Sequence, residues 1–473
     1  MKKLILLIKY LLITITLHVT SVGALPPKAP YLQEIQFEGL QGTAKWDSNY
    51  SQVDGYRLIY ANYPSFTNID VIELGVLTSY QRLLQNGDAL FVAVQAYNAD
   101  GDSELSNIRH FKLDKRIVAL LPLTAAKGKL ASGLSIKAGI EEALANGLWA
   151  DNAKRVRWEI VDATSEIGKF SESEQLKTLY YGDVLPDRIT TKNVRGYVND
   201  PDVLAIVTTS TAASLALTSQ TVENKPLIIA GTATSTILEI NDNLMMMPAS
   251  NKHQADKIYQ KFSQDSETEN RLLKYAVVLD SDIDIVAYSF DLYMLLLQNA
   301  FDKEVSIQQQ ASDTGDTSKP FAQLVGTLVF DGTEEQAELL ASTLDVLAAD
   351  VVFHIGFSRL FKMLYNKRPN LTCIGSDGTH SYKDYQNGDV MVLALEGEEY
   401  LDKASYNNHG YDTVGFLAQM LGELSVLELR RERVLQKTQE TTYVGRTGTK
   451  GFVEKRGSYN ILKATPIGWK KIN

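Results

Sequence analysis

Two loops rich in hydroxyl residues carry the clearest binding chemistry in the sequence. Residues 208–211 (TTST) and 231–234 (GTAT) each follow a short apolar run of the kind that forms a buried strand. Hydroxyls and the free N–H groups at a helix N-terminus can hold a carboxylate, and small residues let such a ligand approach the backbone. The candidate ligand-binding residues in these loops are Ser210, Thr211, Thr232, Ala233 and Thr234. The alternative is that the hydroxyls only cap the helices that follow.

Motifs for catalysis are missing from the chain. It contains neither the Gly-x-Ser-x-Gly motif of serine hydrolases nor the Gly-x-x-x-x-Gly-Lys-Ser/Thr loop that cradles phosphates. The glycine-rich stretch 445–451 has no dinucleotide-binding strand and helix around it. His354, His380 and His409 lie too far apart in sequence to give a metal-ligand spacing. We therefore expect no enzyme activity, no cofactor and no metal site.

Alternating strand-like and helix-like segments must position the two loops. After residue 116, helical stretches such as 213–221 and 286–300 separate apolar runs of strand type. These runs are 117–121, 156–161, 203–207, 226–230, 275–279 and 350–355. The alternation is typical of βαβ units and parallel sheets. Because 358 residues exceed one sheet-centred core, we expect two lobes, with a ligand beyond the carboxyl ends of the strands.

The segment 25–113 follows a different pattern. Apolar residues recur at every second position in two stretches, 56–60 and 90–96, and turn signals such as Asn86-Gly87-Asp88 separate them. This pattern predicts an antiparallel β-sandwich. The short polar stretch Asp114–Arg116 would join it to the α/β part.

The first 24 residues have the features of a cleaved signal peptide. Lys2 and Lys3 precede the apolar stretch 11–19, and small residues at Val22 and Ala24 suit signal peptidase. We expect cleavage after Ala24 and export, to the periplasm or beyond, as a soluble protein. The alternative is a membrane anchor, although Lys9 leaves the apolar run shorter than the ~20 residues of a spanning helix.

Composition restricts the partners of the protein. The 473 residues include 47 Lys and Arg against 57 Asp and Glu, a net charge of −10, and removal of residues 1–24 brings it near −13. No basic tract stands out, so we expect no nucleic-acid binding. The single cysteine, Cys373, lies in a short apolar run, which favours a buried small hydrophobe over a nucleophile.

Several motifs in residues 116–473 together resemble the type I periplasmic binding proteins, most closely their branched-chain amino-acid branch. The resemblance rests on the order and spacing of these pieces. The pieces are Ile117–Thr124, Gly133–Glu142, Thr208–Ala213, Lys225–Thr234, Gly375–Gly378, Gly410–Asp412, and Gly445–Gly448 with Phe452 and Gly457. The resemblance implies a module that captures a solute for an ABC-type transporter. It places lobe one at about 116–249 and 378–440, and lobe two at about 250–377 and 441–473.

The resemblance adds two residues to the candidate site. Asp377 matches the family's acidic position, where its carboxylate would accept hydrogen bonds from a ligand ammonium group; the alternative is a solvated Asp-Gly turn. Phe357 stands at the aromatic position that follows Gly356. The chain departs from the family where Asp284-Ile285 replaces a tyrosine–glycine pair, so the ligand's identity stays open. The implied ligand is small and polar, with an amino acid as the leading candidate.

The N-terminal strands resemble a fibronectin type III domain. Trp46 matches the family's second-strand tryptophan, while 55–60 and 92–98 match its third and sixth strands. Leu90 departs from the pattern, because the family usually has a tyrosine there. The resemblance implies an interaction or spacer module, with an envelope protein or a glycan as its partner.

We therefore predict an α/β protein, a two-lobed type I periplasmic-binding-protein-like module with helices flanking parallel sheets, preceded by a small all-β sandwich. The predicted function is capture of a small polar ligand between the lobes for delivery to an ABC permease. The alternative is an interaction or regulatory protein of the cell envelope that keeps the same fold as a scaffold. The added β domain favours this alternative slightly, because simple binding proteins do not need one.

Overall fold

The structure is a computed structural model. It describes residues 25–47, 53–124, 131–163, 192–209, 211–218, 222–281, 286–314, 322–356, 358–385, 390–398, 406–451 and 458–472. The expected signal peptide, residues 1–24, lies outside these ranges. The chain divides after Asp114 into two compact units, Met1–Asp114 and Lys115–Asn473, which are described separately below.

The first unit consists of two antiparallel sheets that pack face to face. One has the strand order β1-β2-β5 and the other β4-β3-β6-β7, with β8 also paired to β6. The strands are β1 (Gln36–Glu38), β2 (Gln41–Lys45), β3 (Gly55–Asn62), β4 (Asp70–Glu73), β5 (Ser79–Leu83), β6 (Ala89–Asn98), β7 (Gly101–Asp102) and β8 (Arg109–Lys112). Trp46 packs edge-on to Tyr56 in the shared core, with ring centroids 5.7 Å apart. The predicted antiparallel strands are confirmed in β3 and β6.

The second unit contains two large separate sheets and a small two-stranded one, and the two large sheets confirm the predicted two-lobed α/β fold. Lobe one is built on five parallel strands in the order β10-β9-β11-β12-β13. These strands are β9 (Arg116–Leu121), β10 (Arg157–Asp162), β11 (Val203–Thr208), β12 (Leu227–Ala230) and β13 (Leu244–Met246). Every residue of β11 and β12 is buried, which explains their uninterrupted apolar sequences.

Lobe two is built on seven strands in the order β15-β14-β16-β17-β18-β21-β22. The strands are β14 (Leu273–Asp280), β15 (Ala322–Phe330), β16 (Val351–Ile355), β17 (Thr372–Gly375), β18 (Val390–Leu395), β21 (Tyr459–Thr465) and β22 (Gly468–Ile472). The last two pair antiparallel, whereas the others are parallel. Val277 and Val278 of β14 enter cores on opposite faces of the sheet, so helices must cover both faces.

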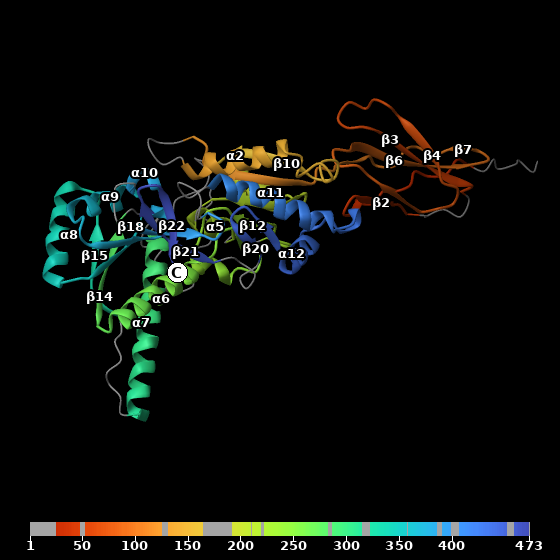
Figure 1. Cartoon of the computed structure of the whole chain (residues 1–473). Coiled ribbons are helices and arrows are strands. Elements are labelled where there is room, and N and C mark those ends of the chain that lie inside the picture. The colour runs from red at the N-terminus through yellow and green to blue at the C-terminus, as the bar shows by residue number, and fades with distance from the viewer. Residues whose placement is uncertain are drawn as a thin grey trace, which may run out of the picture. The chain divides into compact units, whose positions relative to one another are not determined.

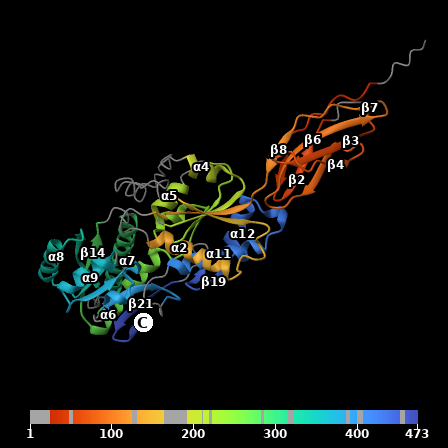
Figure 2. The same cartoon turned by 90° about the horizontal axis from the view of Figure 1, so that it is seen from above.

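Helices flank both sheets of the second unit (Figures 1 and 2). Those packed with lobe one include α2 (Ala131–Ala145), α4 (Lys192–Asn199), α5 (Thr211–Thr218), η1 (Thr236–Ile240), α11 (Tyr406–Gly422), η4 (Val426–Glu428) and α12 (Arg431–Glu440), followed by the hairpin β19 (Tyr443–Gly445) and β20 (Gly448–Lys450). Those of lobe two include α6 (Asn251–Glu269), α7 (Val286–Thr314), α8 (Glu334–Leu347), α9 (Ser358–Lys367), η3 (Asp377–Thr379) and α10 (Tyr382–Tyr385). Figure 2 shows α2 and α11 side by side, and the two helices are in contact.

The sequence analysis places the segment 378–440 in lobe one, and this prediction is wrong for part of the segment. Its strand β18 pairs in parallel with β17 and antiparallel with β21, so it belongs to the sheet of lobe two. Conversely, β19 contacts α11, although residues 441–473 had been assigned to lobe two. The chain therefore crosses between the lobes after β13, after β18 and before β21. The fully apolar core of Val390–Leu395 makes this strand suited to a central position, buried on both faces.

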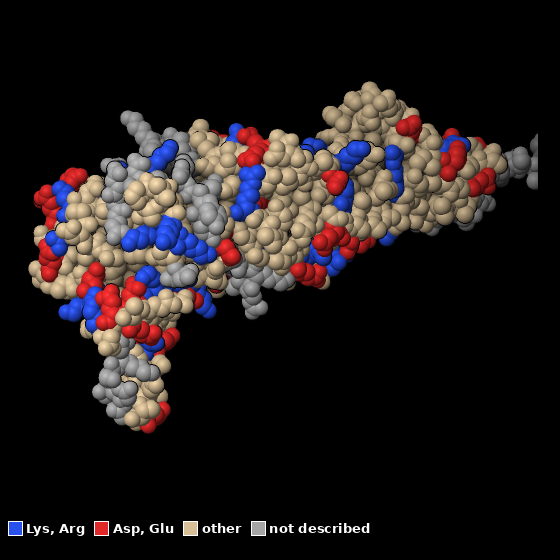
Figure 3. All heavy atoms as spheres, in the orientation of Figure 1, with Lys and Arg blue, Asp and Glu red and all other residues tan. Residues whose placement is uncertain are grey.

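The edge hairpin of lobe two carries a group of basic side chains. Figure 3 shows Lys and Arg gathered over β21 and β22, whose strands contain Lys463, Lys470 and Lys471. Lys463 and Lys470 lie directly opposite each other in the ladder. Charged residues on the last strand of a sheet oppose pairing with a strand of another molecule. We attribute this group to protection of the sheet edge.

Candidate functional site

The carboxyl ends of β11 and β12 bring the two hydroxyl-rich loops together. Thr208 and Ala230 end these parallel strands in register. The N–H of Gly231 donates to the carbonyl of Thr208 at 2.8 Å, and the N–H of Thr232 donates to the carbonyl of Thr209 at 3.2 Å. A Cβ on Gly231 would lie only 3.1 Å from the carbonyl oxygen of Thr208, so the close approach of the loops favours glycine.

The predicted hydroxyl residues occupy different environments in these loops. Thr211 is the first residue of α5, and Thr232 is half-buried. Thr234 is 3% exposed, and its carbonyl accepts a hydrogen bond of 2.6 Å from the N–H of Asn251. Ala233 packs into the hydrophobic core of lobe one, so its side chain supports the loop from behind. Ser210 lies outside the described residues.

Thr208 is a further hydroxyl residue that the sequence analysis did not include in the site. Its side chain is fully buried, and its hydroxyl oxygen has no hydrogen-bond partner among the described residues. Buried polar atoms in native proteins are nearly always paired, so a buried hydroxyl of this kind calls for a partner such as water or a ligand. The signal in the sequence is its position directly after the apolar run 203–207.

In lobe two, Asp377 lies at the carboxyl end of β17 as the first residue of η3. The hydroxyl of Tyr288 donates to its Oδ1 at 2.7 Å, and the hydroxyl of Tyr459 lies 3.1 Å from its Oδ2. Burial raises the pKa of Asp377, whereas these two hydrogen bonds lower it. The carboxylate is therefore held in a fixed orientation and is not the freely solvated side chain of an ordinary turn.

The tyrosines around Asp377 were not recognised in the sequence. Burial, followed by the charge of Asp377, raises the pKa of Tyr288 and of Tyr459 well above the ordinary value, so both hydroxyls stay protonated. Burial also raises the pKa of Tyr406, and the charge of Asp377 raises it further by a smaller amount. Tyr288 comes from the start of α7, three residues after Ile285. Phe357 lies outside the described residues.

A chain of hydrogen bonds through the start of α6 connects the two loops to Asp377. The N–H of Asn251 binds the carbonyl of Thr234, and the side chain of Gln254 donates to Oδ1 of Asn251 at 3.2 Å. Oε1 of Gln254 in turn accepts from the backbone N–H of Asp377 at 3.2 Å. The side chains of Asn251 and Gln254 are fully buried. The geometry therefore fixes the spacing between the Thr234 loop and Asp377.

Metal chemistry finds no support in the described ranges, where no cluster of three or more His, Cys, Asp or Glu residues is arranged to hold an ion. His354 is buried and stacks on Phe361 at 5.4 Å, and burial lowers its pKa to about 3, which keeps it neutral. Cys373 is fully buried, and burial raises the pKa of its thiol to about 12. The prediction that Cys373 is a buried small hydrophobe is confirmed.

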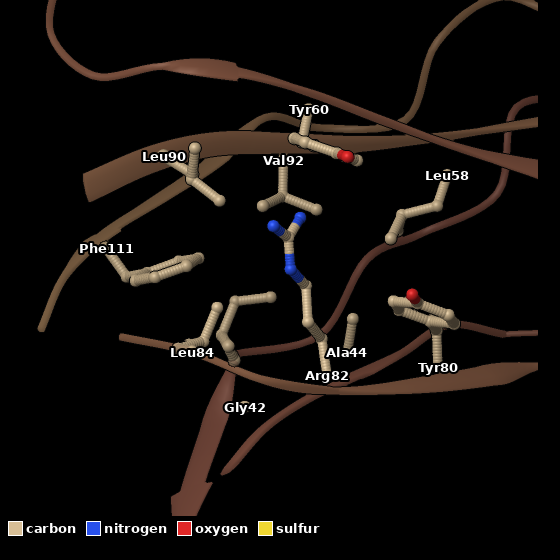
Figure 4. A pocket seen from close by; sticks show the side chains of 11 residues that line it. Gly42, Ala44, Leu58, Tyr60, Tyr80, Arg82, Leu84, Leu90, Val92 and Phe111 are labelled. Carbon is tan, nitrogen blue, oxygen red and sulfur yellow. The ribbon is translucent and has the colours of Figure 1, made fainter. Parts of the chain in front are cut away.

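A small cavity lies in the first unit, between its two sheets. Its volume is about 40 Å³, and its apolar lining includes Leu58, Leu84, Val92 and Phe111. Figure 4 shows the side chain of Arg82 reaching into it, and the guanidinium carbon lies 4.9 Å from the ring centroid of Tyr60. Arg82 is on β5, the last strand of its sheet, where an inward-pointing charge opposes edge-to-edge pairing. We attribute this arrangement to packing.

None of the helices in the described part of the chain combines the length and apolar character needed to cross a membrane.

No protein-family model and no curated protein matches the sequence.

Solved structures do match the fold. An ABC transporter substrate-binding protein from Desulfitobacterium hafniense in complex with Leu aligns with a TM-score of 0.51 at 12% identity, over 76% of this chain and 99% of that one. A leucine-, isoleucine-, valine-, threonine- and alanine-binding protein from Brucella ovis gives 0.52 at 10% identity, over 76% and 94%. A solute-binding protein from R. palustris in complex with 4-hydroxybenzoate gives 0.52 at 11% identity, over 76% and 96%. At such low identities the likeness establishes the two-lobed fold alone.

Proposed function

We propose that this protein is an exported solute-binding protein that captures a small polar ligand, with an amino acid as the leading candidate, for an ABC-type transporter. The observation that carries the proposal is the pairing of two chemistries at the carboxyl ends of the strands. Lobe one offers the hydroxyl-rich loops around Thr232 and Thr234, and lobe two offers the oriented carboxylate of Asp377. Ligands of open α/β sheets bind at such ends.

The two ends suit the two charges of a zwitterion. Hydroxyls and the N-terminal amides of α5 would donate to a ligand carboxylate. An ionised Asp377 has about four acceptor positions, and Tyr288 occupies one of them. The single proton of Tyr459 is shared between Asp377 and the carbonyl of Ala249, which lies 2.9 Å away. Gln254 and the backbone N–H of Gly378 also interact with this carboxylate, so a ligand ammonium group would share its acceptor positions with these donors or displace one of them.

The proposal includes export, removal of residues 1–24 and docking of the closed module on a permease. It is tested by isothermal calorimetry of the mature chain, beginning at Leu25, against a panel of the common amino acids, with benzoate and 4-hydroxybenzoate as ligands that lack an ammonium group. Stoichiometric binding of an amino acid supports the proposal. Binding of the aromatic acids alone would replace the zwitterion by an anion, and binding of none would remove the transport role.

A second candidate is an envelope interaction protein that uses the binding-protein fold as a scaffold. It is favoured by exposed rings on the first unit, where Phe66 is 53% exposed and stacks on Phe91 at 3.8 Å. Tyr63 stacks on His110 beside them, with ring centroids 5.0 Å apart. Aromatic rings of this kind suit a protein or a glycan surface. A pull-down with residues 25–114 that retains an envelope component, together with a ligand-free second unit, would favour this candidate.

A further inference from the structure

Asp291, on α7 of lobe two, makes hydrogen bonds to lobe one. Its Oδ2 accepts from the backbone N–H of Thr236 at 2.8 Å, and its Oδ1 accepts from the hydroxyl of the same residue. Oδ2 also accepts from the side-chain amide of Asn251 at 2.8 Å. Asp291 is 4% exposed, so these donors replace most of the water that an ionised carboxylate would otherwise bind.

The contact joins two separate hydrophobic cores. Thr236 begins η1, whose Ile237 and Leu238 pack in the core of lobe one. Leu292, next to Asp291 in α7, packs in a core of lobe two. The hydrogen bonds of Thr236 to Asp291 therefore exist only while η1 and α7 are in contact. If the lobes separated here, the carboxylate would lose two donors at once.

Asn251 ties this contact to the candidate site. It follows β13, where the chain crosses from lobe one to lobe two, and it is fully buried. Its side-chain amide binds both Asp291 and the carbonyl of Tyr288, at 2.8 and 3.0 Å. Its backbone N–H holds the carbonyl of Thr234, and Gln254 extends the network to Asp377. Asp291 thus lies where the crossing segment meets both ends of the site.

We propose that Asp291 is a positioning residue that holds the two lobes in the arrangement in which the Thr234 loop and Asp377 face the same ligand. The inference rests on the proposed function for the existence of that ligand, whereas the contact between the lobes can be tested without one. Charge-assisted hydrogen bonds are stronger than neutral ones, so Asp291 is suited to bias the equilibrium between contacting and separated lobes.

The experiment measures the distance between the lobes by pulsed electron resonance, in the mature chain without ligand. Spin labels are attached to cysteines introduced at Asp242 in lobe one and at Val346 in lobe two, both exposed. Cys373 is buried and does not compete for the label. Asp291→Asn replaces one acceptor oxygen by a donor, and Thr236→Val removes only the hydroxyl. Thr236→Ser keeps that hydroxyl, and Asp265→Asn is a control on α6, where Asp265 pairs with Lys261.

Asp291→Asn and Thr236→Val are expected to lower the ratio of contacting to separated lobes, by about ten- to a hundred-fold for the loss of one charge-assisted hydrogen bond. Thr236→Ser and Asp265→Asn should keep the wild-type distance distribution. The proposal is overturned if Thr236→Val melts cooperatively and still has the wild-type distribution of distances between the two labels. If Asp291→Asn does not fold, the result for Thr236→Val alone decides. Failure of the wild type to bind any ligand would remove the proposed function but would not alter these distances.

Discussion

Gly139 of α2 and Gly410 of α11 allow the two helices of lobe one to pack backbone against backbone. A Cβ on Gly139 would overlap the carbonyl of Asn407, and a Cβ on Gly410 would overlap the carbonyl of Ile136. Each glycine therefore makes room for the backbone of the other helix. Tyr406 and His409 lie in the first turn of α11, so this packing also sets the position of that turn. The turn lies beside the loop after β12, where the carbonyl of Gly231 is 2.8 Å from Nδ1 of His409.

Gly410→Ala should destabilise the second unit, because the added methyl group meets a backbone carbonyl and not a side chain that can rotate away. Overpacking of this kind costs about 1–3 kcal/mol in the free energy of unfolding. Urea unfolding followed by circular dichroism measures the change. Gly422→Ala is the matched control at the end of the same helix, where a Cβ meets nothing within 4 Å, and it should be neutral or slightly stabilising. Equal stability losses in the two variants would contradict the packing argument.

Asp377→Asn should weaken binding of an amino acid, because it removes the charge that would hold the ammonium group while keeping the shape of the side chain. A charge-assisted hydrogen bond contributes ~1.5–3 kcal/mol, so the dissociation constant should rise by about ten- to a hundred-fold. Calorimetry of the mature chain measures it.

Thr234→Ala should have a smaller effect, since backbone amides would still hold the ligand carboxylate. Asp377→Asn should leave the binding of ligands without an amine nearly unchanged. If an amino acid binds wild type and Asp377→Asn equally well, Asp377 does not contact the ammonium group.

The sequence predicted the strands and the loops far better than the residues that surround them. The apolar runs at β11 and β12 predict buried parallel strands. The register of these two strands then places the 208–211 and 231–234 loops side by side. Asp377 was found because a local Gly-Ser-Asp-Gly motif carries it. Tyr288 and Tyr459 were missed because they lie 89 and 82 residues from Asp377 in sequence, and only the packing of α7 and β21 brings them to it.

Asn251 illustrates a second limit of the sequence. Its neighbours Ser250 and Lys252 suggest nothing more than an ordinary helix start, and Asn is common there. Its function as a junction depends on Thr234, Tyr288 and Asp291, which come from three different segments. Likewise, the crossing of the chain after β18 depends on strand pairing that no local pattern reveals.

The second unit should fold without the first. Among the described residues, the hydrophobic clusters that pack on its two large sheets contain no residue from before Lys115. Its first strand is secured internally, with Lys115 bound to Asp202 at 2.7 Å and Arg116 bound to Asp200 at 2.7 Å. A fragment comprising Lys115–Asn473 is therefore expected to melt cooperatively, at a temperature close to that of the same unit in the full chain. Differential scanning calorimetry of both proteins measures this. A fragment without a cooperative transition would mean that the β unit completes its core.

The buried His354 should make the second unit less stable in acid. Its pKa is lowered by burial from 6.5 to about 3 in the folded protein, so between these values the unfolded chain binds one more proton at this residue. The free energy of unfolding therefore rises with pH across this window. The contribution of the neutral His354 is fully present above about pH 6.5 and is lost as the pH falls toward 3. Between pH 7 and pH 5 the loss from this group is about 2 kcal/mol.

His354→Phe keeps a flat ring against Phe361 and removes the titrating group. The quantity to compare is the difference in unfolding free energy between pH 7 and pH 5, measured in urea for the fragment Lys115–Asn473 of wild type and variant. Any cost of fitting the larger ring is the same at both pH values and cancels in this difference. The variant should lose about 2 kcal/mol less than wild type on acidification. An identical loss in both proteins would mean that His354 is protonated in the folded state, with a polar partner or water reaching its ring.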